Sequence, residues 1–77
     1  MKFVILGKTG CSSCNQAKAL LESKGISFDY LMLGKDYDMN KFMSFGVPHK
    51  SFPLITQVID GEEQYVGGLE QLKQLLK

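Results

Sequence analysis

The sequence has 77 residues, of which 44% are hydrophobic and 22% are charged, and its formal net charge is +1. A chain of this length supports one hydrophobic core, so we expect a single domain over residues 1–77. No apolar run approaches the roughly 20 residues of a membrane span, and the start is not typical of a secretory signal. Because the charges are also nearly balanced, we expect a cytoplasmic protein that binds neither membranes nor nucleic acid.

The first half of the chain predicts a strand, a helix and a second strand. Residues 2–6 form a continuous apolar run, which is typical of a central strand buried on both faces. Four residues then recur at helical spacing: Cys14, Ala17, Leu20 and Leu21. Lys24-Gly25 is typical of a helix end, and residues 27–33 alternate as a strand. Two strands joined by a helix are expected to be parallel, with a right-handed crossover.

The second half predicts a short helix, a hairpin and a terminal helix. Asp36 or Asp38 could cap the short helix, which should end at Gly46 before Pro48. Four apolar residues of this region are expected to face the sheet: Met39, Phe42, Met43 and Phe45. Strands at 53–59 and 63–66 flank Asp60-Gly61, which favours a type I′ turn. The terminal helix should carry four leucines on one face: Leu69, Leu72, Leu75 and Leu76.

These elements together predict an α/β fold in the order βαβ-α-ββα. A four-stranded mixed sheet flanked by helices satisfies that order. In an open α/β sheet, function is usually found where strands lead into helices. The two cysteines lie at such a point, between the first strand and the first helix.

Cys11 and Cys14 are expected to have a chemical role rather than a structural one. A disulfide between them would close a very small loop, and the stabilisation by a disulfide grows with loop length. A structural zinc site needs four ligands, but the chain has no further cysteine and a single histidine, His49. We therefore expect no metal site.

The expected position of the pair favours thiolate chemistry. A helix N-terminus offers unpaired backbone N–H groups and a partial positive charge, and both lower the pKa of a thiol from the ~8.5 of a free cysteine. Cys11 is nearer the exposed loop and is the expected nucleophile. Cys14 lies one turn further into the helix, where we expect it to stay protonated until it resolves a mixed disulfide.

Three separated motifs resemble those of one family. KTGCSSC, the proline before a strand in SFPLI, and the double glycine of YVGGLEQL are together similar to the glutaredoxins, especially the small dithiol glutaredoxins of bacterial or phage type in the thioredoxin superfamily. The resemblance covers nearly the whole chain. It implies a thioredoxin-like fold and a glutathione-dependent thiol–disulfide oxidoreductase that reduces protein disulfides or glutathione mixed disulfides. Ribonucleotide reductase is the protein partner commonly named for small members.

The same resemblance assigns roles around the cysteines. Cys11 matches the attacking cysteine of the family and Cys14 the resolving one. Lys8 matches a basic residue that helps bind the glycine carboxylate of glutathione. Pro53 matches the cis-proline beside the cysteines, which leaves the Phe52 backbone free to pair with a bound thiol substrate. A proline that merely starts an edge strand is the alternative for this position.

Further residues of the expected glutathione site lie between the cysteines and after the hairpin. Ser12-Ser13 stands where Pro-Tyr is frequent, and a serine hydroxyl can donate a hydrogen bond to a thiolate. Gly67-Gly68 matches the double glycine that lets the backbone approach the ligand closely. Leu69 and Glu70 begin the helical turn that binds the γ-glutamyl end of glutathione in the family. An acid in a first helical turn also complements the helix dipole without any ligand.

Two alternatives to this function stay open at the level of sequence. Small redoxins that thioredoxin reductase reduces have a similar sequence and lack a good glutathione site. Some members with a serine beside the first cysteine hold an iron–sulfur cluster between two subunits with glutathione. We expect a monomer that uses glutathione as a reductant, not tightly bound, rather than a cluster carrier.

Overall fold

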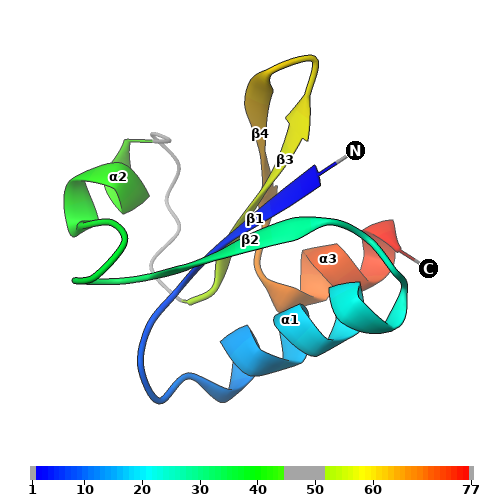
Figure 1. The fold of residues 1–77 in the computed structure, drawn as a ribbon, viewed down its shortest axis with the longest axis horizontal. Helices are drawn as coiled ribbons and strands as arrows, with labels where there is room; N and C mark the ends of the chain where they lie inside the picture. Colours follow the sequence, from blue (N-terminus) through cyan, green and yellow to red (C-terminus); the bar gives the residue numbers. More distant parts are fainter. Residues whose placement is uncertain (1, 45–51, 77) are drawn as a thin grey trace.

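The computed structural model describes residues 2–44 and 52–76 of the chain. Within these residues the elements follow the predicted order (Figure 1). Their bounds are β1 Lys2–Gly7, α1 Ser12–Ser23, β2 Phe28–Met32, α2 Met39–Met43, β3 Leu54–Ile59, β4 Glu62–Gly67 and α3 Leu69–Leu75. The predictions for Phe45, Gly46, Pro48 and His49 lie outside the described residues.

The strands form a four-stranded mixed sheet in the order β2-β1-β3-β4. β1 and β2 are parallel, whereas β3 is antiparallel to both β1 and β4. The predicted mixed sheet and the parallel first pair are therefore confirmed. Residues 3–6 of β1 are buried, as the apolar run indicated, because β1 has a strand on each side and helices on both faces.

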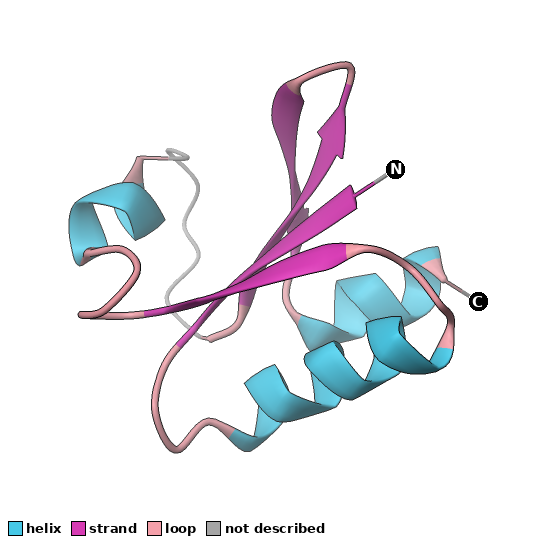
Figure 2. Ribbon diagram, in the orientation of Figure 1, coloured by secondary structure: helices cyan, strands magenta, loops and turns pink. Residues whose placement is uncertain are grey.

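Two hydrophobic clusters lie on opposite faces of this sheet. Helices α1 and α3 pack side by side on one face, and α2 lies over the other (Figure 2). The main core, between the sheet and α1 and α3, consists of Phe3, Ile5, Ala17, Leu21, Ile55 and Leu72. The smaller cluster, beside α2, consists of Val4, Leu6, Phe42 and Leu54. Successive residues of β1 alternate between the two clusters, as side chains of a strand must.

Local signals end these elements where the sequence predicted. Asp38, one of two expected caps, accepts a hydrogen bond from Lys41 N–H at 3.2 Å at the start of α2. The hairpin between β3 and β4 turns at Asp60 and Gly61, with φ angles of 53° and 83°. Positive φ at both central residues is the requirement of a type I′ turn, and glycine meets it without steric cost.

Several residues predicted for the core are in fact exposed. Met39 is 43% exposed and Met43 69%, while Phe42 is 3% exposed, because the five-residue α2 directs one side chain into the smaller cluster. On α3, Leu72 is fully buried but Leu75 is 51% exposed. Leu75 lies on the flank of α3 that faces β4, where it lines a groove instead of packing on α1.

The register brings three loops to one end of the sheet. Gly7, the last residue of β1, pairs with Met32 at the end of β2. Leu54, the first residue of β3, pairs with Leu6, which precedes Gly7 in β1. Gly67, at the end of β4, pairs with Ile55 of β3. The segments that follow β1, precede β3 and follow β4 therefore meet at this end of the molecule.

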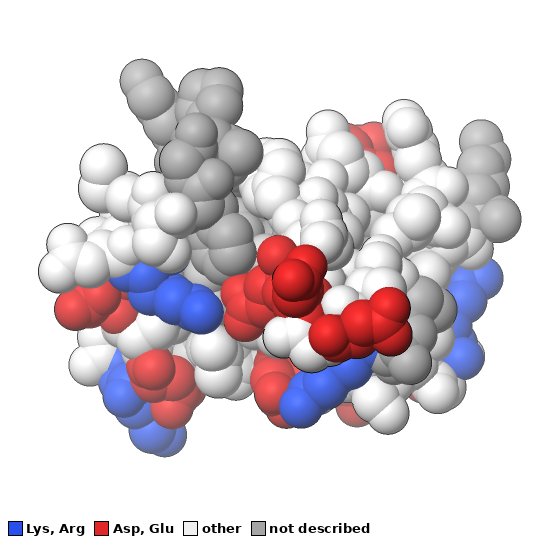
Figure 3. All heavy atoms as spheres, turned by 90° about the horizontal axis from the view of Figure 1, so that it is seen from above, with Lys and Arg blue, Asp and Glu red and all other residues white. Residues whose placement is uncertain are grey.

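Acidic and basic side chains are mixed on the surface. The face seen in Figure 3 carries both signs close together. Lys2 Nζ lies 2.8 Å from Asp29 Oδ2, and Lys41 Nζ lies 3.5 Å from Glu63 Oε1. Among the described residues, no helix is both long enough and apolar enough to cross a membrane.

Candidate active site

The two cysteines lie at the N-terminus of α1, as predicted. Cys11 is the N-cap residue, with an extended backbone, and Cys14 lies in the first helical turn. Their Cα atoms are 5.3 Å apart, and their sulfur atoms form a disulfide. Cys11 is 9% exposed and Cys14 is fully buried. Of the two cysteines, Cys11 is therefore the one with residual exposure to solvent.

The helix start places a hydrogen-bond donor on the accessible sulfur. Cys14 N–H donates to Cys11 Sγ at 3.2 Å, so the sulfur takes the capping role that an oxygen usually fills. The partial positive charge of a helix N-terminus acts at the same place and favours a negatively charged sulfur. Ser12 and Ser13 hydroxyls make no hydrogen bond to either sulfur. The hydrogen bond from a serine to the sulfur thus stays a prediction for the reduced state.

Gly7 lies next to Cys14. A Cβ at this position would lie 2.7 Å from Tyr30 Oη and 3.2 Å from Cys14 Cβ, so only glycine leaves room here. The carbonyl oxygen of Gly7 accepts two hydrogen bonds, from Tyr37 Oη at 2.8 Å and from Leu33 N–H at 3.0 Å. Burial, and secondarily the nearby Tyr30, raises the pKa of Tyr37 to about 12, so its hydroxyl stays a donor at neutral pH.

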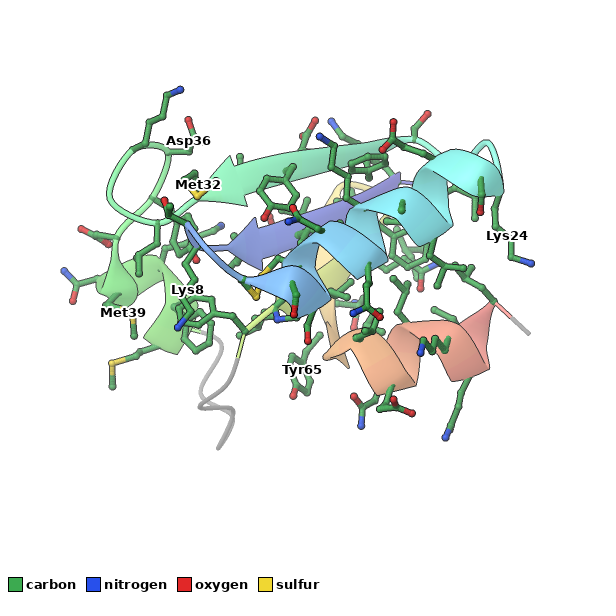
Figure 4. The ribbon with its side chains drawn as sticks, turned by 90° about the horizontal axis from the view of Figure 1, so that it is seen from below. Lys8, Lys24, Met32, Asp36, Met39 and Tyr65 are labelled. Carbon is green, nitrogen blue, oxygen red and sulfur yellow. A yellow bond between two sulfur atoms is a disulfide. The ribbon has the colours of Figure 1, made fainter. Side chains whose placement is uncertain are left out.

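The loop between β1 and the cysteines is held against β2. Thr9 Oγ1 donates to Met32 Sδ at 3.6 Å, and Met32 N–H donates to Asp36 Oδ2 at 2.9 Å. Figure 4 shows Lys8, Met32, Asp36 and Met39 at one end of the sheet and Lys24 at the opposite end. The first hydrogen bond holds the loop before Cys11 to the end of β2, and the second joins Met32 to the segment that follows β2.

Lys8, Phe52 and Pro53 come together on the α2 side of this end. The Phe52–Pro53 peptide bond is cis, which is the predicted isomer. The Phe52 ring lies 4.8 Å from the Phe42 ring, and Lys8 Nζ lies 5.1 Å from the Phe52 ring centroid. Among the described residues, Lys8 has no acidic partner. Its cationic group is therefore available to a ligand carboxylate.

The double glycine lies at the same end of the sheet as the cysteines, where β4 ends two strands away from β1, and a side chain from α3 covers it. Gly67 is buried, with a φ of 135°, and a Cβ there would lie 2.6 Å from Gln71 Cγ. Gln71 Oε1 accepts a hydrogen bond from Gly68 N–H at 2.9 Å. Of the other predicted residues, Leu69 packs on the main core and Glu70 is exposed. In this chain the first glycine makes room for Gln71.

Sequence reasoning missed the roles of Tyr37 and Gln71. No local pattern relates Tyr37 to Gly7, because the two are 30 residues apart in the chain. A signal for Gln71 was present, since a glutamine three residues after a helix N-cap is one half of a capping box. The side chain of Gln71 makes that hydrogen bond to Gly68 N–H.

Comparison with known proteins agrees with this geometry. The family model of glutaredoxins matches residues 3–63. The chain belongs to the glutaredoxin family. No curated protein sequence matches this glutaredoxin significantly.

Solved glutaredoxins share the fold of this glutaredoxin. Glutaredoxin 1 from Francisella tularensis, solved in complex with cacodylate, has a TM-score of 0.73 at 29% identity, covering 97% of this chain and 91% of that one. Reduced Escherichia coli glutaredoxin has a TM-score of 0.75 at 25% identity, covering 99% and 93%. Brucella melitensis glutaredoxin has a TM-score of 0.69 at 29% identity, covering 99% and 78%. The fold is thus thioredoxin-like, and family and fold suggest a thiol–disulfide oxidoreductase.

Proposed function

We propose that this glutaredoxin is a glutathione-dependent thiol–disulfide oxidoreductase that acts on protein disulfides or glutathione mixed disulfides. The observation that carries the proposal is the asymmetry of the cysteine pair. Cys11 caps α1, is 9% exposed and accepts an N–H hydrogen bond at its sulfur, whereas Cys14 is fully buried. This asymmetry supports Cys11 as the attacking sulfur and Cys14 as the resolving one.

The reaction follows from these positions. Cys11 thiolate attacks one sulfur of the substrate disulfide, which forms a mixed disulfide and releases the other sulfur as a thiolate. Cys14 then loses its proton and attacks Cys11 Sγ, releasing the second substrate thiol and forming the Cys11–Cys14 disulfide. Two glutathione molecules supply two electrons, which restores the dithiol and yields one glutathione disulfide. A glutathione mixed disulfide can also be reduced through Cys11 alone, with a second glutathione taking the place of Cys14.

The proposed glutathione site extends from the cysteines in two directions. On one side, Lys8 would hold the glycine carboxylate, and its position on the Phe52 ring, with no acidic partner in residues 2–44 and 52–76, supports this. Next to it, the Phe52 backbone before the cis Pro53 would pair with the peptide of the bound thiol, with Ser12-Ser13 nearby. On the other side, Gly67-Gly68, Leu69 and Glu70 would face the γ-glutamyl end. Ribonucleotide reductase is one candidate among protein acceptors, and we place the activity in the cytoplasm.

Two experiments test the proposal. The first measures reduction of a mixed disulfide between glutathione and a small thiol, with glutathione reductase recycling the glutathione. Activity should vanish in Cys11→Ser and persist in Cys14→Ser, whereas reduction of an intramolecular protein disulfide should fall in both variants. Activity retained by Cys11→Ser would contradict the assigned roles. Turnover by thioredoxin reductase without any glutathione activity would favour the redoxin alternative.

The second experiment tests Lys8 against a matched lysine. Lys8→Ala should raise the KM for glutathione severalfold, because exposed ion pairs contribute roughly 0–1 kcal/mol. Lys24→Ala removes the same charge at the opposite end of the molecule and should leave the KM unchanged (Figure 4). Equal effects of the two variants would assign the change to net charge and not to a carboxylate contact.

A further inference from the structure

The Gln71 side chain covers the double-glycine turn. One hydrogen bond holds this position, in which Oε1 accepts from Gly68 N–H at 2.9 Å. A Cβ built on Gly67 would lie 2.6 Å from Gln71 Cγ and 2.9 Å from Gln71 Cβ. The methylene groups therefore fill the open face of Gly67, and the amide oxygen occupies the adjacent backbone donor. The turn offers little free backbone to a ligand while Gln71 stays in place.

Gln71 has space for a second position. Its side chain is exposed, and it also lines a shallow groove of about 470 Å³ between β4 and α3. The groove is formed by polar amides and a few apolar groups: Gln57, Tyr65, Val66, Gln71, Gln74 and Leu75. Figure 4 shows Tyr65 of this groove near the start of α3. Rotation into the groove would uncover Gly67 and Gly68 without moving the backbone.

We propose that Gln71 is a specificity-determining residue of this glutaredoxin that closes the Gly67-Gly68 turn against glutathione. The inference rests on the proposed function, since it concerns the γ-glutamyl end of the same site. Glutathione must displace the Gln71 amide to reach the turn, whereas a protein disulfide reaches Cys11 without using it. Gln71 thus lowers the affinity for glutathione and shifts the preference toward protein disulfides.

The size of the effect follows from the interaction that must be broken. One exposed hydrogen bond changes an equilibrium by roughly twofold to tenfold, because the donor and acceptor can pair with water instead. Gln71→Ala removes the amide and the Cγ methylene and keeps only Cβ, so the KM for glutathione should fall by about that factor with kcat nearly constant.

Three variants separate this role from helix capping. Gln71→Ala opens the turn, and Gln71→Glu keeps an oxygen that can accept from Gly68 N–H, so Gln71→Glu should not lower the KM. Gln74→Ala is a control in the same groove, and the three atoms nearest the Cβ position of Gly67 all belong to Gln71. Each variant is assayed with glutathione on the mixed disulfide and with dithiothreitol on insulin disulfides. Thermal unfolding of each variant measures how much stability is lost with the helix cap. The KM for glutathione does not measure that loss, so the two readouts separate capping from ligand access.

The inference is supported if the KM for glutathione falls in Gln71→Ala and not in Gln71→Glu or Gln74→Ala. The ratio of glutathione activity to dithiothreitol activity should then rise in Gln71→Ala. Glutathione activity that is present in Gln71→Ala and absent in the unaltered protein also supports the inference. An unchanged or raised KM overturns it and leaves the proposed function standing. Dithiothreitol activity with no glutathione activity in any variant overturns both the inference and the glutathione dependence.

Discussion

Gly7 is where a single methyl group should most directly disturb the packing next to Cys14. In Gly7→Ala the new Cβ would lie 2.7 Å from Tyr30 Oη, 3.0 Å from Tyr30 Cζ and 3.2 Å from Cys14 Cβ. Favourable separations between carbon atoms are about 3.5–4.0 Å, so all three contacts are too close. Overpacking of this kind typically costs about 1–3 kcal/mol of unfolding free energy. We expect a loss of about 2 kcal/mol for Gly7→Ala.

Tyr30→Phe tests whether the contact with the Tyr30 hydroxyl causes the loss of stability in Gly7→Ala. Tyr30 Oη has no hydrogen-bond partner among the described residues, so the single change should have little effect on stability. In the double variant the 2.7 Å contact is gone and those at 3.0 and 3.2 Å remain, so stability should be partly restored, with a coupling energy of about 1 kcal/mol.

The assay is urea unfolding of the two single variants and the double variant. A shift of the midpoint with an unchanged m-value is a change in stability alone. Gly10→Ala is a matched control: Gly10 has a φ of 75° and no atom within 4 Å of its Cβ position, so backbone conformation alone makes that variant unfavourable. Tyr30→Phe should not restore the stability of Gly10→Ala. An equal cost of Gly7→Ala with and without the Tyr30 hydroxyl would refute the assignment of this cost to the contact with that hydroxyl.

Three further predictions concern the tyrosine hydrogen bond, the α2 cap and the α3 core. Because folding raises the pKa of Tyr37 from 10.0 to about 12, its contribution to stability is fully present below pH 10.0 and is lost as the pH rises toward about 12. Urea unfolding of Tyr37→Phe should lack this alkaline loss, and absorbance titration should lose the tyrosinate step at about pH 12. Asp38→Ala removes a side-chain acceptor at the start of α2 and should cost about 1 kcal/mol by thermal unfolding. Leu72→Ala should cost about 2–5 kcal/mol and Leu75→Ala within about 0.5 kcal/mol, and equal losses would contradict their assigned burial.

Much of the fold could be predicted because its signals are local. The apolar run of residues 2–6, the helical spacing after the cysteines and the Asp60-Gly61 turn each act within a few residues. Side-chain periodicity and turn geometry determine such elements before any long-range contact forms. The order of the elements then allowed few arrangements, and the mixed sheet with a parallel first pair was one of them. The cysteine pair could be placed at a helix start for the same reason.

The sequence by itself determined the elements, the position of the cysteines and, through three motifs, the family. Only the tertiary structure decided which apolar side chains are buried, so that Leu72 lies in the core and Leu75 does not. It also decided why two glycines are needed: Tyr30 occupies the space beside Gly7, and Gln71 fills the face of Gly67. These contacts join residues from different elements, and the element that packs opposite a given face cannot be read from the periodicity of that face. Burial and close approach are therefore properties of the assembled sheet and helices.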